Sequence, residues 1–317
     1  MKTCRICNSS GDFGIITARE MMFGSRETFD YFRCDFCECL QIDLYPESID
    51  KHYPPDYYSL ANTTPSDSPL LRFLVGERDM FAATGKGVVG RLLYWVKSKD
   101  EIRNVSSALR NKNLRILDVG SGGGGFLRQL RNAGFKNLTG IDPFISEDQI
   151  VDDHLVIRKQ SIFEHAGEYD SIFFNHSFEH MPRQSEVIKS ASELLVKGGK
   201  LVIRIPLSSS FAYQKYGRDW VQLDAPRHFY LHSLKSIGIL ISSAGLEMET
   251  VKFDSFDFQF WGSELYQRDV ALLGGQASFD SQRSNFTESE LKMFSEEARR
   301  VNSEGIGDQA IFISTKQ

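Results

Sequence analysis

The chain has 317 residues, which is more than one ordinary domain contains, so we expect at least two structural units. Hydrophobic residues make up 41% of the sequence and charged residues 25%, as in water-soluble globular proteins, and no apolar run is long enough to span a membrane. The formal net charge of −5 argues against a nucleic-acid-binding protein, which needs an excess of basic side chains. The first residues lack the apolar core of a secretory signal peptide, which predicts a cytoplasmic location.

All five cysteines lie within the first 39 residues. Cys4 and Cys7 form one Cys-x-x-Cys pair, and Cys34 and Cys37 form a second pair 26 residues later. Two such turns can present four sulfurs to one ion, and this spacing is typical of a four-thiolate Zn²⁺ site. Cys39 is an alternative ligand, but we favour Cys37 because the first pair also has two intervening residues. With four thiolates bound, the ion has no open position and is expected to be structural.

The spacing of prolines and apolar residues divides the chain into three regions. Five of the nine prolines fall between Pro46 and Pro69, a stretch that cannot form one regular element. We therefore expect a zinc-binding ribbon at residues 1–60, a linker with two or three N-terminal helices at 61–112, and an α/β domain at 113–317. The ribbon carries six basic side chains against ten acidic ones, which makes it a poor binder of nucleic acid.

Short apolar strands alternate with amphipathic helices from Leu114 onward. Such alternation predicts a mostly parallel sheet with right-handed crossovers. The aromatic run at 253–261 could form one face of a core strand, which we favour, or a lid or dimer surface. The expected strands are 115–119, 138–141, 155–157, 169–174, 200–205, 248–253 and 310–314. The expected helices are 126–133, 185–195, 233–244 and 288–301.

A glycine cluster closes the first of these strands and opens the following helix. Gly120, Gly122 and Gly124 match the pattern G-x-G-x-G, whereas Gly120, Gly122 and Gly125 match the dinucleotide pattern G-x-G-x-x-G. The glycines alone leave both patterns open. Asp142 ends the second strand 22 residues after Gly120, where a carboxylate can accept hydrogen bonds from both ribose hydroxyls of an adenosine.

With this spacing the chain resembles the class I S-adenosylmethionine-dependent methyltransferases. Three more segments carry the resemblance: the fourth strand with its continuation at 169–176, the Phe-Glu-His-Met segment at 178–181, and the glycine turn before the fifth strand at 194–203. The resemblance implies a Rossmann-like sheet whose last strand is antiparallel, and S-adenosylmethionine as the cofactor. The residues it implies at the cofactor are Asp118, Gly120, Ser121, Gly122, Gly124, Asp142, Pro143, Ser161, Ile162 and Asn175.

Three histidines stand where an acceptor would be activated. His176 and His180 follow the fourth strand, and His228 follows the fifth. A histidine suits removal of the acceptor's proton because its unperturbed pKa is about 6.5. We expect Arg227 to lower the pKa of His228 and keep this base neutral. His180 remains open as a base or a structural hydrogen-bonding residue, and a His176–His180 metal pair is not expected because the order H-E-x-x-H is absent.

The segment around His228 also bears on the acceptor. Residues 224–228, Asp-Ala-Pro-Arg-His, resemble a segment of bacterial methyltransferases that modify sugars and polysaccharides, and we expect Trp220 and Tyr230 to line the pocket wall. The cysteine region resembles the zinc-binding region of some sugar C-methyltransferases, which implies that Tyr57 or Tyr58 reaches the acceptor.

The function expected from the whole sequence is methyl transfer to a small or carrier-linked acceptor, with a sugar favoured and with carbon or oxygen as the methylated atom. A nicotinamide-dependent oxidoreductase built on the Gly125 pattern is one alternative. A zinc-ribbon adaptor with a degenerate methyltransferase domain is the other.

Overall fold

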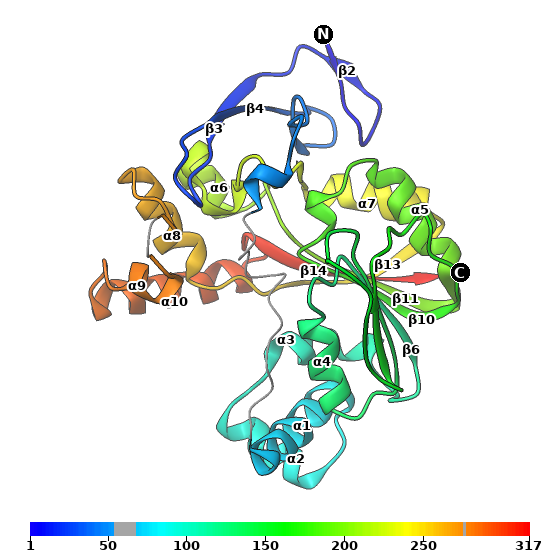
Figure 1. Cartoon of the computed structure of the whole chain (residues 1–317). Coiled ribbons are helices and arrows are strands. Elements are labelled where there is room, and N and C mark those ends of the chain that lie inside the picture. The colour runs from blue at the N-terminus through cyan, green and yellow to red at the C-terminus, as the bar shows by residue number, and fades with distance from the viewer. Residues whose placement is uncertain (54–67, 275–276) are drawn as a thin grey trace.

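The computed structural model describes residues 1–53, 68–274 and 277–317, which form an N-terminal β unit, a helical connector and a large α/β unit (Figure 1). Tyr57 and Tyr58 lie outside the described residues. Among the helices of these three ranges, none combines the length and apolar character that crossing a membrane requires.

The N-terminal β unit is completed by a strand from much later in the chain. Its small antiparallel sheet has the order β12-β5-β4-β3. In this sheet Tyr230 pairs with Gln41, and Leu231 pairs with Leu40. Main-chain pairing therefore ties the first 50 or so residues to the α/β unit. The elements are β1 (Lys2–Thr3), β2 (Ser10–Gly11), β3 (Ile15–Arg19), β4 (Thr28–Arg33), β5 (Leu40–Ile42), η1 (Asp50–His52) and β12 (Tyr230–Leu231).

The connector contains three α-helices, in agreement with the two or three that the apolar spacing predicted. The Ser68 hydroxyl accepts a hydrogen bond from a backbone N–H of the first turn at 3.3 Å and so caps the first helix. Gly85 ends this helix in the left-handed conformation, with φ of 72°. Gly90 lets the second helix pack closely, because an added Cβ would lie 2.1 Å from the Glu77 carbonyl oxygen. The elements are α1 (Pro69–Thr84), α2 (Val88–Val96), α3 (Asp100–Asn104) and η2 (Ser106–Ala108).

The α/β unit is built on an eight-stranded sheet with the order β13-β14-β11-β10-β6-β7-β9-β8. Strands β6, β7, β9, β10 and β11 pair in parallel, and β14 runs antiparallel to both of its neighbours. The mostly parallel sheet with an antiparallel last strand is thus confirmed, although edge strand β8 was not expected. The strand order reverses between β6 and β10, and ligands bind at such a switch point. The strands are β6 (Arg115–Val119), β7 (Asn137–Ile141), β8 (Gln149–Asp152), β9 (Leu155–Arg158), β10 (Tyr169–Asn175), β11 (Leu195–Pro206), β13 (Leu246–Phe253) and β14 (Gln309–Lys316).

Most helices of the α/β unit lie where the sequence predicted them, but the aromatic run does not form a strand. Its second half begins helix α8, which buries Phe260, Trp261 and Leu265, whereas Phe256 precedes the helix and is 54% exposed. The strand interpretation is wrong, because an apolar run this short does not distinguish a strand from a buried helix, but the placement in the core is confirmed for Phe260 and Trp261. The elements are α4 (Gly125–Asn132), η3 (Phe178–His180), α5 (Gln184–Leu194), α6 (Phe211–Tyr216), η4 (Gly217–Asp219), η5 (Val221–Leu223), α7 (Leu234–Ser243), α8 (Phe258–Gln267), α9 (Phe279–Arg283) and α10 (Glu288–Ser303).

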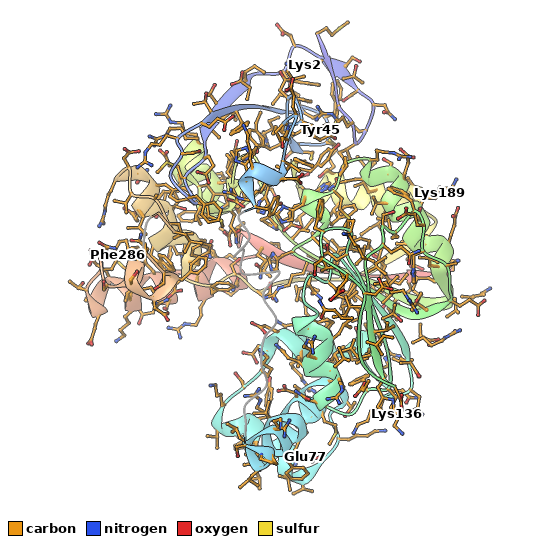
Figure 2. All side chains as sticks on the ribbon, in the orientation of Figure 1. Lys2, Tyr45, Glu77, Lys136, Lys189 and Phe286 are labelled. Carbon is orange, nitrogen blue, oxygen red and sulfur yellow. The ribbon has the colours of Figure 1, made fainter. Side chains whose placement is uncertain are left out.

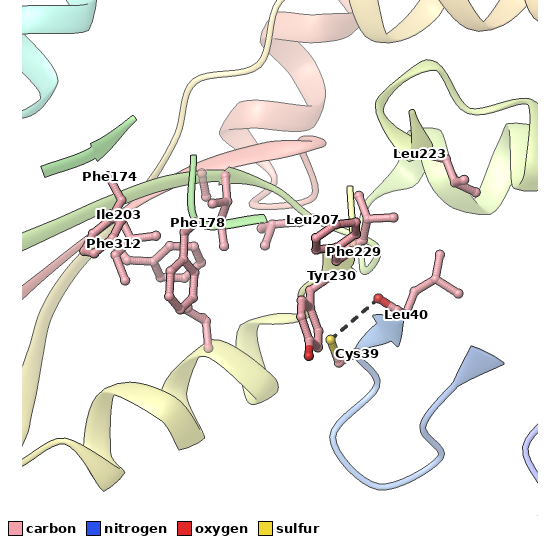
Figure 3. Packing of buried hydrophobic residues seen from close by; sticks show 14 of the residues in the cluster. Cys39, Leu40, Phe174, Phe178, Ile203, Leu207, Leu223, Phe229, Tyr230 and Phe312 are labelled. Carbon is pink, nitrogen blue, oxygen red and sulfur yellow. Dashed lines mark hydrogen bonds between the residues drawn. The ribbon is translucent and has the colours of Figure 1, made fainter. Parts of the chain in front are cut away.

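One hydrophobic core runs from the N-terminal β unit into the sheet. Leu40 of the N-terminal unit lies near Phe229 and Tyr230, and Leu207 and Phe178 lead from there toward the central strands (Figure 3). The β unit therefore shares its core with the α/β unit. This shared core places the N-terminal residues next to the carboxyl ends of the central strands.

Candidate active site

The glycine loop at the end of β6 adopts the conformation of the first of the two glycine patterns. Gly120, Gly122 and Gly124 have φ of 73°, 52° and 76°, a left-handed backbone that side chains disfavour. An added Cβ would also lie 2.5 Å from Ser177 at Gly120 and 2.3 Å from Ile157 at Gly124. Gly125, which the dinucleotide pattern needs, opens α4 with no atom within 4 Å of an added Cβ. The pattern G-x-G-x-G is therefore the one that the fold requires.

Asp142 at the end of β7 holds this loop in place. Its Oδ2 accepts a hydrogen bond from the Gly122 amide at 2.9 Å, and its Oδ1 accepts one from the Phe144 amide at 2.8 Å. The hydroxyl of Ser121, in the middle of the loop, is buried and has no hydrogen-bond partner among the described residues. A buried hydroxyl without a partner is costly, which favours a polar ligand group at this position.

One cavity of about 1110 Å³ contains nearly all of the residues expected at the cofactor. It exceeds the roughly 1,000 Å³ at the upper end of ordinary ligand pockets, so it has room for a cofactor and an acceptor together. Gly124 does not line the cavity and instead lies behind the loop against Ile157. The expected residues that line it are Asp118, Gly120, Ser121, Gly122, Asp142, Pro143, Ser161, Ile162 and Asn175.

Two of these residues have environments that the sequence did not reveal. Burial, together with the nearby Asp142 carboxylate, raises the pKa of Asp118 to about 7. Its Oδ1 accepts a weak hydrogen bond of 3.5 Å from the Asn175 amide. Ser161 donates its hydroxyl to Glu164 at 2.7 Å, so this hydroxyl already has a partner at the cavity edge.

The three expected histidines lie around Glu179 and line the same cavity. His176 Nδ1 lies 3.6 Å and His228 Nε2 lies 4.0 Å from Glu179 Oε1. The rings of His180 and His228 are 4.7 Å apart between centroids. His176 itself has φ of 49°, a strained conformation for a residue with a side chain, as is common at functional sites.

His228 is held in one tautomer. Its Nδ1 lies 2.7 Å from the Gln222 carbonyl oxygen, which can only accept, so Nδ1 carries the proton and Nε2 has a free lone pair. Burial is the main cause that lowers the pKa of His228 to about 4, and the nearby His180 adds to this effect. The pKa is lowered as expected, but the expected cause is wrong. Arg227 turns away from the ring and forms ion pairs with Asp224 and Glu20.

His180 is oriented in the same way. Its Nδ1 lies 2.9 Å from the Arg227 carbonyl oxygen and 3.1 Å from the Tyr53 hydroxyl. Its Nε2 is therefore the nitrogen left with a lone pair. Glu179 has no exposed surface, and neither of its carboxylate oxygens has a hydrogen-bond partner among the described residues. The sequence predicted the three histidines as site residues but not Glu179, although its position next to His180 in a Glu-His dipeptide could have indicated it.

Aromatic side chains from distant segments form the rest of the cavity wall. Tyr45 and Tyr53 come from the N-terminal β unit, where Figure 2 labels the first; Phe258 begins α8, and Phe256 lies just before it. The expectation that Trp220 and Tyr230 form this wall is wrong. The Trp220 indole donates to Asp308 at 3.1 Å, and the Tyr230 hydroxyl bonds to that of Tyr45 at 2.5 Å, because both rings are packed in the core.

The sulfur atoms of Cys4, Cys7, Cys34 and Cys37 all lie within 4.8 Å of one another. The Cys4–Cys37 and Cys7–Cys34 distances are 3.5 Å and 3.7 Å. A tetrahedron with Zn–S bonds of about 2.3 Å has sulfur–sulfur edges of about 3.8 Å. Cys39 lies outside this group, with its sulfur 3.7 Å from the Leu40 carbonyl oxygen (Figure 3).

The two cysteine turns have the same backbone geometry. Asn8 and Glu38 both have left-handed φ, of 60° and 63°. Each donates its amide to the carbonyl of the first cysteine of its pair, at 3.0 Å and 2.9 Å. Cys39 then occupies the position that Ser9 has in the first turn, since each of the two accepts a hydrogen bond from the first cysteine's amide. The repeated geometry therefore presents the sulfur of Cys37 rather than that of Cys39.

A family model described as a methyltransferase domain matches residues 96–251, which include the glycine loop, Asp142 and the histidine cluster. The chain is an S-adenosylmethionine-dependent methyltransferase of class I. The nicotinamide-dependent alternative is thereby excluded, in agreement with the conformations of Gly124 and Gly125.

The relatives of this methyltransferase have similar names. A protein of Xanthomonas axonopodis pv. citri named "Ubiquinone biosynthesis O-methyltransferase" is 28% identical in an alignment 166 residues long that covers 46% of this chain and 68% of the relative. A protein of the same name from Hydrogenovibrio crunogenus is 33% identical over 28% of this chain and 41% of its own. Among solved structures, an S-adenosylmethionine-dependent methyltransferase of Mesorhizobium loti covers 70% of this chain and 100% of its own at 14% identity, with a TM-score of 0.44.

Proposed function

We propose that this methyltransferase transfers a methyl group to a hydroxyl oxygen of a neutral acceptor, free or carrier-linked, and that the acceptor is a sugar. One observation carries the proposal. The glycine loop and the histidine cluster line the same cavity, which has room for two ligands. The relatives' name, which specifies an O-methyltransferase, favours oxygen over carbon as the methylated atom.

The residues of the first half of the cavity fit S-adenosylmethionine. Bound there, it supplies an activated methyl group on a cationic sulfonium. The backbone of Gly120 and Gly122 would approach the methionyl end, where the Ser121 hydroxyl lacks a partner. Asp142 would accept hydrogen bonds from the ribose hydroxyls, and the Asp118 carboxylate is the nearby anion that a cationic ligand would favour. Pro143, Ser161, Ile162 and Asn175 would complete the wall.

The histidine cluster would act on the acceptor. The Nε2 lone pairs of His180 and His228 belong to rings fixed through Nδ1, so both nitrogens are positioned before the acceptor binds. We assign His228 as the group that removes the hydroxyl proton, with His180 as the alternative, and we place His176 beside the reacting oxygen. Holding that oxygen in line with the transferred methyl group accounts for much of the rate enhancement expected from positioning.

The charge of the cavity bears on the acceptor class. Among the described residues that line it there is no lysine or arginine, whereas the carboxylates of Asp50, Asp224 and Glu179 lie on the acceptor side. This lining disfavours an acceptor whose phosphate groups enter the cavity. The rings of Tyr45 and Tyr53 could stack on the apolar face of a sugar. Their origin in the cysteine-containing region agrees with the resemblance to sugar methyltransferases.

A phenolic acceptor is the second candidate, because the wall beside the N-terminal tyrosines is strongly apolar. Phe256, Phe258, Leu272 and Phe279 all contribute to it. Such a wall would also suit an aromatic ring, and the relatives' name, which specifies ubiquinone biosynthesis, is compatible with a phenolic acceptor.

The test is a methyl-transfer assay with radiolabelled S-adenosylmethionine and a panel of neutral glycosides, sugar nucleotides and catechols. We expect label on glycoside oxygen, and label on a catechol alone would favour the second candidate. His228→Ala should abolish turnover without changing the affinity for S-adenosylhomocysteine. His154→Ala is the matched control, since His154 is exposed and does not line this cavity. Wild-type rates with His228→Ala would exclude it as the base.

We also propose that Cys4, Cys7, Cys34 and Cys37 hold a structural Zn²⁺ ion. The Cys4 sulfur accepts a hydrogen bond of 2.9 Å from the Gln41 side chain, which would stabilise a thiolate. Metal analysis of the purified protein should find this zinc in the wild type and in Cys39→Ser but not in Cys37→Ser. Zinc retained in Cys37→Ser and lost in Cys39→Ser would reassign the ligand.

A further inference from the structure

We propose that Glu179, His180 and His228 bind one divalent transition-metal ion at the acceptor end of the cavity, and that the histidines activate the acceptor through this ion. The inference rests on the proposed function, and it replaces direct proton removal by His228 with activation of the acceptor by an ion that His228 helps to hold. It concerns a site separate from the four cysteines, which lie in the N-terminal β unit.

The three side chains offer one ligand atom each in a compact group. A carboxylate oxygen of Glu179 and one ring nitrogen each of His180 and His228 all lie within 4.8 Å of one another. Two imidazoles and one carboxylate form the ligand set of many mononuclear metal sites, in which the remaining positions stay open. All three residues line the cavity, so the open positions would face the acceptor.

The two histidines are held as metal-bound histidines usually are. A metal-ligating imidazole typically donates its other ring N–H to a backbone carbonyl or a carboxylate, which fixes the ring and its tautomer. Here Nδ1 of His228 donates to the Gln222 carbonyl at 2.7 Å, and Nδ1 of His180 donates to the Arg227 carbonyl at 2.9 Å. Both rings therefore keep the Nε2 lone pair for an ion.

Glu179 supplies an independent reason for a cation. It is fully buried, and neither carboxylate oxygen has a hydrogen-bond partner among the described residues. The nearby histidines favour its ionised form, whereas the nearby Asp224 is itself negative and is already paired with Arg227 at 2.6 Å. His176 Nδ1, at 3.6 Å, is too far for a hydrogen bond. A buried, ionised carboxylate without a hydrogen bond is costly, and a bound cation would offset that cost.

The ligand set also indicates which ions fit. Imidazole nitrogens suit Mn²⁺, Fe²⁺, Co²⁺ or Zn²⁺ better than Mg²⁺ or Ca²⁺, which prefer oxygen ligands. Open positions on such an ion would take two adjacent oxygens of the acceptor, as in a vicinal diol or a catechol. The acceptor hydroxyl would give its proton to water, because a bound cation lowers the pKa of an attached oxygen. That oxygen then forms the O–CH₃ bond as the S–CH₃ bond breaks with its electron pair left on sulfur. The products are the methyl ether, S-adenosylhomocysteine and a proton.

The test is a titration of the full-length protein with Mn²⁺, followed by electron paramagnetic resonance, with zinc at the cysteine site quantified throughout. We expect one bound Mn²⁺ per chain that shows nitrogen coupling from histidine. Glu179→Gln and His180→Ala should each weaken Mn²⁺ binding by more than roughly 100-fold. Loss of a residue that only hydrogen-bonds a metal ligand typically weakens binding by up to about 100-fold, so a larger effect indicates a ligand. His154→Ala and the exposed Glu186→Gln are the matched controls and should bind as the wild type does.

Three outcomes are decisive because the affinity for S-adenosylhomocysteine is measured on the same samples. Mn²⁺ binding that depends on Glu179 and His180 supports the site. Unaltered cofactor binding and methyl transfer, with no Mn²⁺ bound to the wild type, would overturn the metal site and leave the histidines as direct bases. Nitrogen-coupled Mn²⁺ in a protein that binds no S-adenosylhomocysteine would support the metal site and count against the proposed function.

Discussion

The buried guanidinium of Arg227 lies at the junction between the N-terminal β unit and the α/β unit, and a substitution there measures how much this junction contributes to stability. Arg227 has no exposed surface and pairs with Asp224 at 2.6 Å and with Glu20 at 2.9 Å. Glu20 belongs to the N-terminal unit, whereas Asp224 follows η5. Replacing Arg227 by methionine keeps most of the side-chain volume but leaves two buried carboxylates without this cation.

The structure sets the size of the effect. Removing one partner of a buried ion pair typically costs about 3–5 kcal/mol. Glu20 would keep hydrogen bonds of 2.9 Å from the amides of Phe23 and Ser25, so most of the cost should fall on Asp224. Unfolding entropy is about 2.1 cal/mol/K per residue, or about 0.7 kcal/mol/K for this chain. The midpoint temperature of Arg227→Met should therefore fall by about 4–8 °C.

Scanning calorimetry at neutral pH measures this change directly. The double variant Arg227→Met with Asp224→Asn removes the uncompensated charge and should recover about half of the loss. Arg218→Met, for which the structure shows no ion pair among the described residues, serves as the control and should change stability by less than about 0.5 kcal/mol. A loss below about 1 kcal/mol in Arg227→Met, or no recovery in the double variant, would refute the view that this ion pair holds the junction.

Three further predictions concern the cofactor half of the cavity. Asp142→Ala should weaken S-adenosylhomocysteine binding by ~1–3 kcal/mol, since a charged hydrogen-bond acceptor is lost, and calorimetry showing unchanged affinity would contradict the ribose assignment. Gly124→Ala should destabilise the loop and reduce the affinity for S-adenosylhomocysteine, whereas Gly125→Ala should do neither. Equal losses of affinity in the two variants, measured by calorimetry, would contradict the assignment of the loop to the pattern G-x-G-x-G. Burial raises the pKa of Asp118 from 3.8 to about 7. Ionisation of this carboxyl group therefore lowers the free energy of unfolding progressively as the pH rises from about 4 to about 7. Asp118→Asn should therefore stabilise the cofactor-free protein at pH 8 by up to on the order of 4 kcal/mol and give no gain at pH 4, as urea unfolding at the two pH values would show.

The local pattern of the sequence was enough to predict the sheet and the cofactor loop. Strands such as 115–119 and 138–141 are short apolar runs between glycine-containing turns, and these signals depend on neighbouring residues alone. The glycine positions 120, 122 and 124 could be predicted for the same reason, because a left-handed backbone at a strand end constrains the residue type locally.

Local signals were insufficient where two structures fit one pattern. Alternate aromatic residues at 256, 258 and 260 suited a core strand, but the chain from Phe258 onward forms helix α8, which packs against η5 and α10. Arg227 stood next to His228 in the sequence, yet its side chain points to the opposite side and pairs with Glu20, more than 200 residues away. Neighbours in the chain do not share an environment when their side chains diverge.

The sequence by itself determined the class of fold, the G-x-G-x-G loop, Asp142 and the paired cysteine turns, because each is a short-range pattern. Only the tertiary structure brought Glu179 and His180 together with His228, which comes almost 50 residues later. It also showed that the sulfur of Cys39 is not part of the group of four cysteine sulfurs. It also joined β12 to the N-terminal sheet, so that tyrosines of the first 53 residues reach the cavity. These features depend on contacts between distant segments, and such contacts form only when the shared hydrophobic core assembles.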